Sequence, residues 1–291
     1  MDIEIKDSYV TSSTVGYFAP TLLGWDTTIK GVNASMHGTV ANFKGRVDNL
    51  TLEDGGTIKA SAHIRGLVDV ARTRFDVDVK RVDVTTTEFV RLLGNIAHLK
   101  VPEKARPYIE RTDRLEIKGK FKGLISSFEA SAVANLKSGG VLTAQCNMHT
   151  EESGRRVTAE MVADRLNISP LVAASSPLSA SFSVKGSAGF GSELSAEVVG
   201  SIDTLHFNNY NYRDISFDAT HNEGLTALNM GSADKNLRAS LQAAMMEDED
   251  GTPAYSAVMN IENADLTAPV AELGGKSLGE TLLTPTKMYV K

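Results

Sequence analysis

Hydrophobic and polar residues alternate with a period of two along most of this chain, and this pattern limits the possible folds more than any other feature. In RFDVDVK, Phe75, Val77 and Val79 lie on one side of an extended backbone, and charged residues lie on the other. TIKASAHI from residue 57 and LEIKGKF from residue 115 repeat the pattern. A period of two is typical of a strand with one dry and one hydrated face. The sequence therefore predicts antiparallel sheet.

Turn residues separate these alternating segments at the intervals expected of hairpins. They tolerate a positive φ, and they occur at Asp54-Gly55-Gly56, Ser138-Gly139-Gly140, Ser153-Gly154, Glu223-Gly224 and Asp250-Gly251. The phase of the alternation slips by one residue between Val79 and Val82, and again between Ile202 and Leu205. A slip of this kind indicates a β-bulge, which increases the twist and bending of a strand.

The segment 86–111 departs from the period of two. Its apolar residues have helical spacing, at Phe89, Leu92, Leu93, Ile96 and Leu99. Thr86 or Thr87 is expected to cap a first helix, and Pro102 suits the first turn of a second helix that ends near Arg111. We expect this helical insert to close an end or a flank of the sheet.

A repeated outline runs through the chain, in which a Lys-Gly pair is followed by a second glycine and a hydrophobic alternation. Gly45, Gly123 and Gly200 follow each other at nearly equal steps, and each is expected to mark the second strand of a repeat. The repeats are predicted at approximately 20–94, 108–175 and 178–274, within a single repetitive segment that covers residues 1–291. Such repeats stack on their neighbours because none can bury its apolar face alone.

The predicted fold is mainly β: an elongated, curled antiparallel sheet that forms an open groove, built from degenerate repeats, with the short helical insert near 86–111. Alanines recur among the larger inward residues, and a groove left open for an apolar ligand tolerates them better than a packed sandwich does. Ordinary core packing explains each inward residue equally well. The candidate groove-lining residues are Ile58, Phe75, Val77, Val79, Ile117, Phe121, Leu142, Phe217, Leu241 and Met259.

Residues that carry chemistry form no recognisable constellation. The single cysteine, Cys146, lies within an alternating segment and is interpreted as a buried, inert thiol. His149 beside Glu151 and Glu152 is a weak metal candidate, and the acidic run 247–250 is interpreted as a hydrated hairpin tip. The net charge of −6, without a basic stripe, argues against nucleic acid as a partner. We predict no catalytic residues, no cofactor, no metal site and no transmembrane segment, and expect a protein that is not an enzyme.

The strand-glycine segments IKGVNASMHGTV, IKGKFKGL and VKGSAGFGSELSAEVVGSIDTLHF, with the closures DVTTTEF, NISPLV and DLTAPVAEL, resemble the AsmA-like family, and within it the translocation and assembly module (TamB-like) proteins. The resemblance covers roughly residues 20–275. It implies a hydrophobic β-groove that carries phospholipid acyl chains in the periplasm of Gram-negative bacteria. It also implies a middle section of a longer chain, anchored in the inner membrane, whose other parts contact outer-membrane barrel assembly proteins.

Three functions follow from these observations. The first is a periplasmic segment whose groove shields or conducts phospholipid between the inner and outer membranes and so supports outer-membrane biogenesis. The alternative is a structural or adhesive β-solenoid that binds protein partners without catalysis. The third is a carbohydrate-active β-protein, which the low aromatic content of 6% disfavours.

Overall fold

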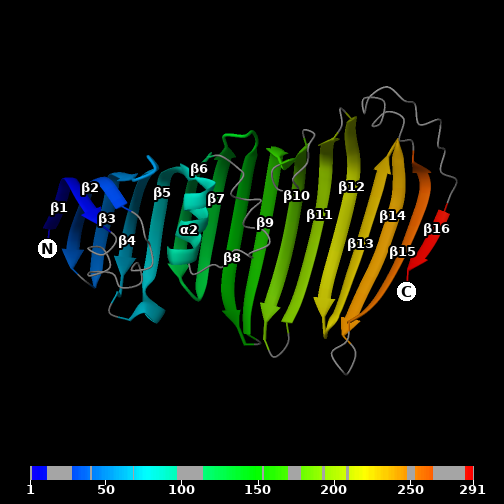
Figure 1. Cartoon of the computed structure of the whole chain (residues 1–291). Helices are drawn as coiled ribbons and strands as arrows, with labels where there is room; N and C mark the ends of the chain where they lie inside the picture. Colours follow the sequence, from blue (N-terminus) through cyan, green and yellow to red (C-terminus); the bar gives the residue numbers. More distant parts are fainter. Residues whose placement is uncertain are drawn as a thin grey trace. The chain divides into compact units, whose positions relative to one another are not determined.

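In the computed structural model, the described part of the chain is almost entirely extended, with one α-helix among its strands (Figure 1). It describes residues 2–11, 28–39, 41–67, 69–96, 114–152, 154–169, 178–191, 194–207, 210–247, 253–264 and 286–290. The chain divides into two compact units. Unit 1 comprises Met1–Gln145 with Pro170–Ala173, and unit 2 comprises Cys146–Ser169 with Ala174–Lys291.

The described part of unit 1 forms seven complete strands, one α-helix and the start of an eighth strand. The strands are β1 (Asp2–Thr11), β2 (Thr28–Thr39), β3 (Asn42–Leu52), β4 (Thr57–Arg65), β5 (Arg74–Thr85), β6 (Arg114–Leu124) and β7 (Ser127–Leu136). The 3₁₀ turn Val70–Arg72 precedes β5, and the helix α2 (Thr86–Ile96) follows it. The boundary between the units falls within β8 (Val141–Glu151).

Unit 2 continues the same pattern with strands of similar length. They are β9 (Gly154–Asn167), β10 (Leu178–Phe190), β11 (Leu194–Phe207), β12 (Tyr210–Asn222), β13 (Leu225–Asp234), β14 (Leu237–Glu247), β15 (Pro253–Ala264) and β16 (Thr286–Val290).

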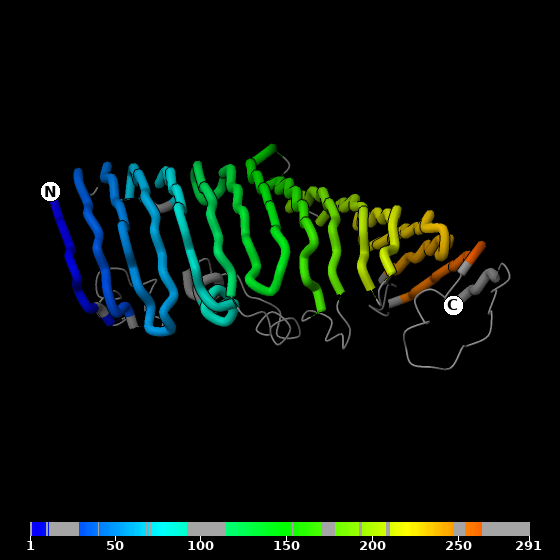
Figure 2. Tube along the Cα trace, turned by 90° about the horizontal axis from the view of Figure 1, so that it is seen from above, coloured from blue at the N-terminus to red at the C-terminus, as the bar shows by residue number. Residues whose placement is uncertain are grey.

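Within each unit, neighbouring strands pair antiparallel, and their order in the sheet is their order in the sequence. For example, Val77 of β5 lies opposite Phe121 of β6, and Phe217 of β12 lies opposite Met230 of β13. The described strands of each unit form one layer (Figure 2). No pairing between the described strands closes either unit into a barrel. The prediction of a mainly β, open antiparallel sheet is confirmed.

Both predicted slips in the alternation are β-bulges. Register shifts lie between Val79 and Val82 of β5 and between Ile202 and Thr204 of β11. These two bulges and three others share one sequence pattern, in which two polar residues separate two apolar ones. The bulged segments are Val47-Asp48-Asn49-Leu50, Val79-Lys80-Arg81-Val82, Ala163-Asp164-Arg165-Leu166, Ile202-Asp203-Thr204-Leu205 and Ile261-Glu262-Asn263-Ala264. The extra residue of a bulge is left out of the ladder, so a hydrated polar side chain suits it.

These bulges lie at one level across each unit, because the registers connect them. In unit 1, Val47, Ala60 and Val79 are cross-strand partners on one side of the bulges, and Leu50, Ile58 and Val82 are partners on the other. We call this level the bulge line. We call one end of each unit the loop end. In unit 1 it is the end of the sheet at which β5 leads into α2, and in unit 2 it is the end at which β15 finishes. The opposite end of each unit is the hairpin end.

Helix α2 is the first helix of the predicted insert, and its start differs from the prediction by one residue. The hydroxyl of Thr85 accepts a hydrogen bond from the backbone N–H of Glu88 at 3.2 Å, so Thr85 is the N-cap. Thr85 also donates to a carboxylate oxygen of Asp54 at 3.2 Å, which ties the cap to the β3–β4 turn. The predicted caps, Thr86 and Thr87, lie inside the helix. The second predicted helix falls on residues outside the described ranges.

The buried apolar side chains concentrate at the loop end of each unit. In unit 1 they form a cluster on β2, β3, β5 and β6, and Phe89 of α2 packs against it. In unit 2, Ala163, Leu166 and Ala180 are buried at or beyond the bulge line. The members of the unit 1 cluster are Ile29, Val32, Leu52, Val84 and Leu115. The apolar core is therefore local, and it leaves the hairpin end of each sheet without a packed interior.

The glycines chosen as repeat markers occupy different structural positions. Gly45 lies in β3 and Gly200 in β11, the second strands of their predicted repeats. Gly123 instead lies in β6, the first strand of its repeat, so the prediction that it marks a second strand is wrong. Gly119 and Gly123 belong to one continuous strand because Lys120 and Lys122 keep the alternation between them.

Candidate functional site

The strand registers bring six predicted lining residues of unit 1 onto one face. Val79 lies opposite Ala60 and Gly119, and Val77 lies opposite Ala62 and Phe121. Directly opposed residues of an antiparallel pair share a face. The predicted residues on this face are Ile58, Phe75, Val77, Val79, Ile117 and Phe121. Their apolar neighbours on the same face, which the prediction did not list among the lining residues, are Phe43, Val47, Leu50, Ile64, Val82 and Phe128. We call these twelve residues the apolar face of unit 1.

Helix α2 covers the loop end of this face. It lies in front of the sheet beside β5 and β6 in Figure 1, and Val90 is 6% exposed there. Leu52 and Val84 beneath it are both completely buried. Ile58 and Ile117 pack against the edge of this cluster. These two predicted lining residues therefore belong to the core, in agreement with the alternative explanation of the inward residues by ordinary core packing.

The hairpin end of the same face is not packed in this way. Phe75, Val77 and Phe121 remain half-buried although they belong to the same strands as Val84 and Leu115. The rings of Phe75 and Phe121 meet edge to face with centroids 6.3 Å apart, and Phe121 lies 4.9 Å from Phe128. Their burial comes from neighbours in the same sheet, and their outer surfaces contact water. Exposed contiguous apolar surface of this kind marks a binding site in many soluble proteins.

The apolar face of unit 2 contains three of the other predicted residues. Phe217, Leu241 and Met259 lie in one cross-strand row, with Met230 between Phe217 and Leu241. Met230 is 41% exposed and Met259 is 37% exposed. We define the apolar face of unit 2 by the row Met161, Val184, Gly200, Phe217, Met230, Leu241 and Met259. Leu142, the remaining predicted residue, is half-buried in the part of β8 that belongs to unit 1.

Gly200 has a specific role in this row. A Cβ atom at Gly200 would lie 2.3 Å from the Phe217 ring, so the ring lies across the backbone of β11. Glycine permits this close approach of an aromatic ring to a strand, and a larger residue here would displace the ring. The sequence signal for it was the glycine inside an otherwise alternating strand.

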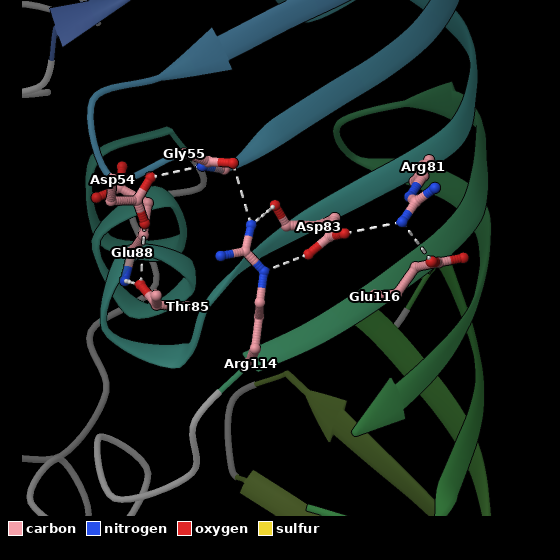
Figure 3. Close-up of polar contacts among 9 residues, drawn as sticks. Asp54, Gly55, Arg81, Asp83, Thr85, Glu88, Arg114 and Glu116 are labelled. Atoms are coloured by element: carbon pink, nitrogen blue, oxygen red, sulfur yellow. Dashed lines mark hydrogen bonds and ion pairs between the residues drawn. The ribbon is translucent and has the colours of Figure 1, made fainter. Parts of the chain in front are cut away.

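The opposite face of unit 1 carries charges that are paired with one another. Figure 3 shows Arg114 between the carboxylate of Asp83 and the carbonyl of Gly55, and Arg81 between Asp83 and Glu116. The Arg114 Nε–Asp83 Oδ1 distance is 2.5 Å, and Arg81 lies 2.8 Å from Asp83 and 3.1 Å from Glu116. The hydrogen bond from Arg114, assisted by Arg81, holds the pKa of Asp83 below its ordinary value despite partial burial.

A small hollow of about 360 Å³ adjoins this charged cluster. Its lining includes Asp83, Arg114, Glu116 and Lys137, together with Leu115 and Leu136 at the ends of β6 and β7. Both carboxylates are already paired with arginine, so their charges are satisfied within the protein. The cluster ties β5, β6 and the β3–β4 turn together beside the cap of α2, which is a structural role.

A second polar network stabilises the loop end of unit 2. The buried carboxylate of Asp234 accepts hydrogen bonds from the Tyr210 hydroxyl at 2.9 Å, the Arg213 N–H at 3.0 Å and the Asn236 N–H at 2.8 Å. Burial alone would raise the pKa of Asp234, but these hydrogen bonds outweigh it and lower the pKa. Burial and the nearby Asp234 carboxylate raise the pKa of Tyr210. The sequence pattern did not indicate this network.

The weak candidates for chemistry are placed as follows. His149 lies 2.9 Å from Glu151, and that carboxylate is also paired with Arg156 at 3.2 Å. Within the described ranges, no three His, Cys, Asp or Glu side chains gather as metal ligands do. Burial raises the pKa of the Cys146 thiol, which makes it less reactive. The acidic run 247–250 lies outside the described residues except for Glu247, which ends β14.

No helix in the described part of the chain is long and apolar enough to cross a membrane. Comparison of the chain with protein-family models, with curated proteins and with solved structures gave no match.

Proposed function

We propose that the apolar faces of the two units bind acyl chains of phospholipid, and that the protein shields or conducts these lipids in the periplasm. The observation that carries the proposal is the half-exposed apolar surface at the hairpin end of unit 1. Phe75, Val77 and Phe121 keep one side toward water, whereas Val84 in the same layer is completely buried. An apolar ligand that covers such an exposed apolar surface removes it from water, and this burial favours binding.

A single-layer sheet binds an acyl chain weakly, which suits the transfer of lipid better than its storage. A buried methylene gains about 0.8 kcal/mol, and a chain lying on an open face has only about half of its surface covered. Ten methylenes would then contribute roughly 4 kcal/mol, which corresponds to a dissociation constant of about 1 mM. An acyl chain bound this weakly dissociates readily. The phospholipid headgroups stay in water beside the apolar face. No nucleophile, metal or cofactor is needed.

The cellular role belongs to the same proposal. The resemblance of the strand-glycine segments to the AsmA-like and TamB-like proteins supports a segment of a longer periplasmic protein that bridges the inner and outer membranes. In that setting the lipid would be phospholipid on its way to the outer membrane. Outer-membrane barrel assembly proteins would be partners of other parts of the longer protein.

Lipid extraction with mass spectrometry tests the binding step. The purified chain is compared with Val77→Asp combined with Phe121→Asp, which places two charges on the apolar face of unit 1. The matched control is Ser61→Asp combined with Ser131→Asp, which places the same charges on the opposite face of the neighbouring strands β4 and β7. We expect phospholipid with the wild type and the control, and about half as much with the apolar-face variant, whose remaining lipid is bound by the unaltered apolar face of unit 2.

Circular dichroism verifies that all three proteins contain the same amount of sheet. Absence of lipid from folded wild type and control would contradict the proposal and would favour the alternative, a non-catalytic sheet that binds protein partners. Equal lipid in all three proteins would show that the lipid is held elsewhere on the chain.

A further inference from the structure

Methionines concentrate on the apolar face of unit 2. Met230 and Met259 flank Leu241 in one cross-strand row, and Met161 begins the same row on β9. The apolar face of unit 1 is built from Phe, Val, Ile and Leu instead. Methionine is flexible and polarisable, so it adapts to apolar ligands of varied shape. It is also the apolar side chain that peroxides oxidise most readily, since its thioether accepts one oxygen atom.

The exposure of these side chains makes the chemistry accessible. Met230 is 41% exposed and Met259 is 37% exposed, and both lie toward the hairpin end from the bulge line. Adjacent strands are about 4.8 Å apart, so the two residues lie on the same face roughly 10 Å apart, with Leu241 between them. Two sulfoxides at these positions would place polar oxygens on both sides of a single apolar side chain.

We propose that Met230 and Met259 form a peroxide-sensitive modification site, and that their oxidation lowers the affinity of the apolar face of unit 2 for acyl chains. A peroxide oxygen is transferred to each thioether sulfur, which is oxidised to the sulfoxide, and hydrogen peroxide is reduced to water. The sulfoxide oxygen loses its hydrogen bonds to water when an apolar chain covers it, and this desolvation disfavours binding. Reduction by a methionine sulfoxide reductase restores the thioether. The inference rests on the proposed function, since it concerns the ligand of the same surface.

A fatty acid that carries a diazirine group is the probe. It is photo-crosslinked to the purified chain before and after hydrogen peroxide treatment, and cross-linked and oxidised peptides are mapped by mass spectrometry. Peptides from β5 to β7 of unit 1 contain no methionine and serve as an internal reference. We expect one added oxygen on Met230 and Met259, and about a tenfold fall in the ratio of unit 2 to unit 1 cross-links.

Leucine variants separate the proposed site from general oxidation. Met230→Leu combined with Met259→Leu conserves volume and removes the thioether at these two positions, so its cross-link ratio should survive peroxide. Met246 is 53% exposed but lies on the opposite face, where it is the partner of Leu225. Met246→Leu should therefore lose cross-links as the wild type does.

Each result bears on the inference in a defined way. A ratio that is unchanged although both methionines are oxidised would overturn the inference and leave the proposed function standing. An equal fall in the double leucine variant would overturn the assignment to these two residues. Cross-links on neither apolar face before oxidation would overturn both proposals together.

Discussion

Two valines of one strand provide a direct test of the open apolar face. Val77 and Val84 both lie in β5 and on the same face of unit 1, but they differ in what covers them. Val84 is completely buried in the cluster under α2, whereas Val77 is half-buried at the hairpin end. Substituting each by alanine removes the same two carbons from the same strand. The loss of β-propensity is similar at both positions and largely cancels in the comparison.

The expected magnitudes follow from burial. At about 0.8 kcal/mol for each buried carbon, Val84→Ala loses roughly 1.6 kcal/mol of transfer free energy. The cavity left under α2 increases this loss to about 2.5 kcal/mol. Val77→Ala removes two methyl groups that are already partly in contact with water. We therefore expect the free energy of unfolding to fall by about 0.8 kcal/mol or less. The difference of more than about 1.5 kcal/mol is well above the error of a denaturation experiment.

Urea unfolding followed by circular dichroism measures the two free energies. Because two units need not unfold together, hydrogen exchange in peptides of β5 assigns the affected transition to unit 1. Equal losses for the two variants would refute the reasoning, because Val77 would then be packed as tightly as Val84. In that case the apolar face would be covered in solution, and the basis of the proposed function would be lost.

Three further outcomes follow from named contacts. Thr85→Ala should lower the free energy of unfolding of unit 1 by about 1 kcal/mol because α2 loses its N-cap acceptor, and Thr85→Ser should restore most of it in the same urea assay. The pKa of Asp83 is lowered in the folded state, so its contribution is complete above the ordinary value of 3.8 and is lost as the pH falls through the lowered pKa. The stability difference between wild type and Asp83→Asn should accordingly shrink in unfolding curves measured below that pH. Gly123→Ala should cost more than about 2 kcal/mol, since Gly123 has a φ of +138° and a Cβ would lie 2.3 Å from the Ser127 carbonyl oxygen. Gly45→Ala, with open space around its Cα, is the matched control, and a comparable loss there would contradict the steric explanation.

The sheet could be predicted from the sequence because its pattern is local. Alternation identifies which residues share a face, and two adjacent polar residues between apolar ones, as in Val79-Lys80-Arg81-Val82, identify a bulge. The cap of α2 was misplaced by one residue because Thr85, Thr86 and Thr87 are equivalent as cap residues in the sequence. Only the end of β5 decides which threonine is the first outside the helix.

The candidate site could be predicted only as a set of residues on a common face. Whether a half-buried strand is covered depends on what packs over it, which the alternation of that strand does not record. Ile58 and Val77 have the same pattern, yet Ile58 packs against the cluster under α2 and Val77 does not. Met230 was overlooked because Asn229 and Gly231 weaken the alternation around it, and only the register of β13 with β12 and β14 places it in the row.

The bulge line has a mechanical consequence. A bulge omits one rung of hydrogen bonds and changes the direction of the strand, so bulges aligned across neighbouring strands act as a transverse crease. In unit 1 the crease separates a stiff panel, held by α2 and the Asp83–Arg114 pair, from a compliant panel that contains Val77 and Phe121. Bending at such a crease changes the angle between the panels without breaking the ladders on either side. The charged residues at the crease, such as Lys80 and Arg81, are exposed to water, so bending there would bury no charge.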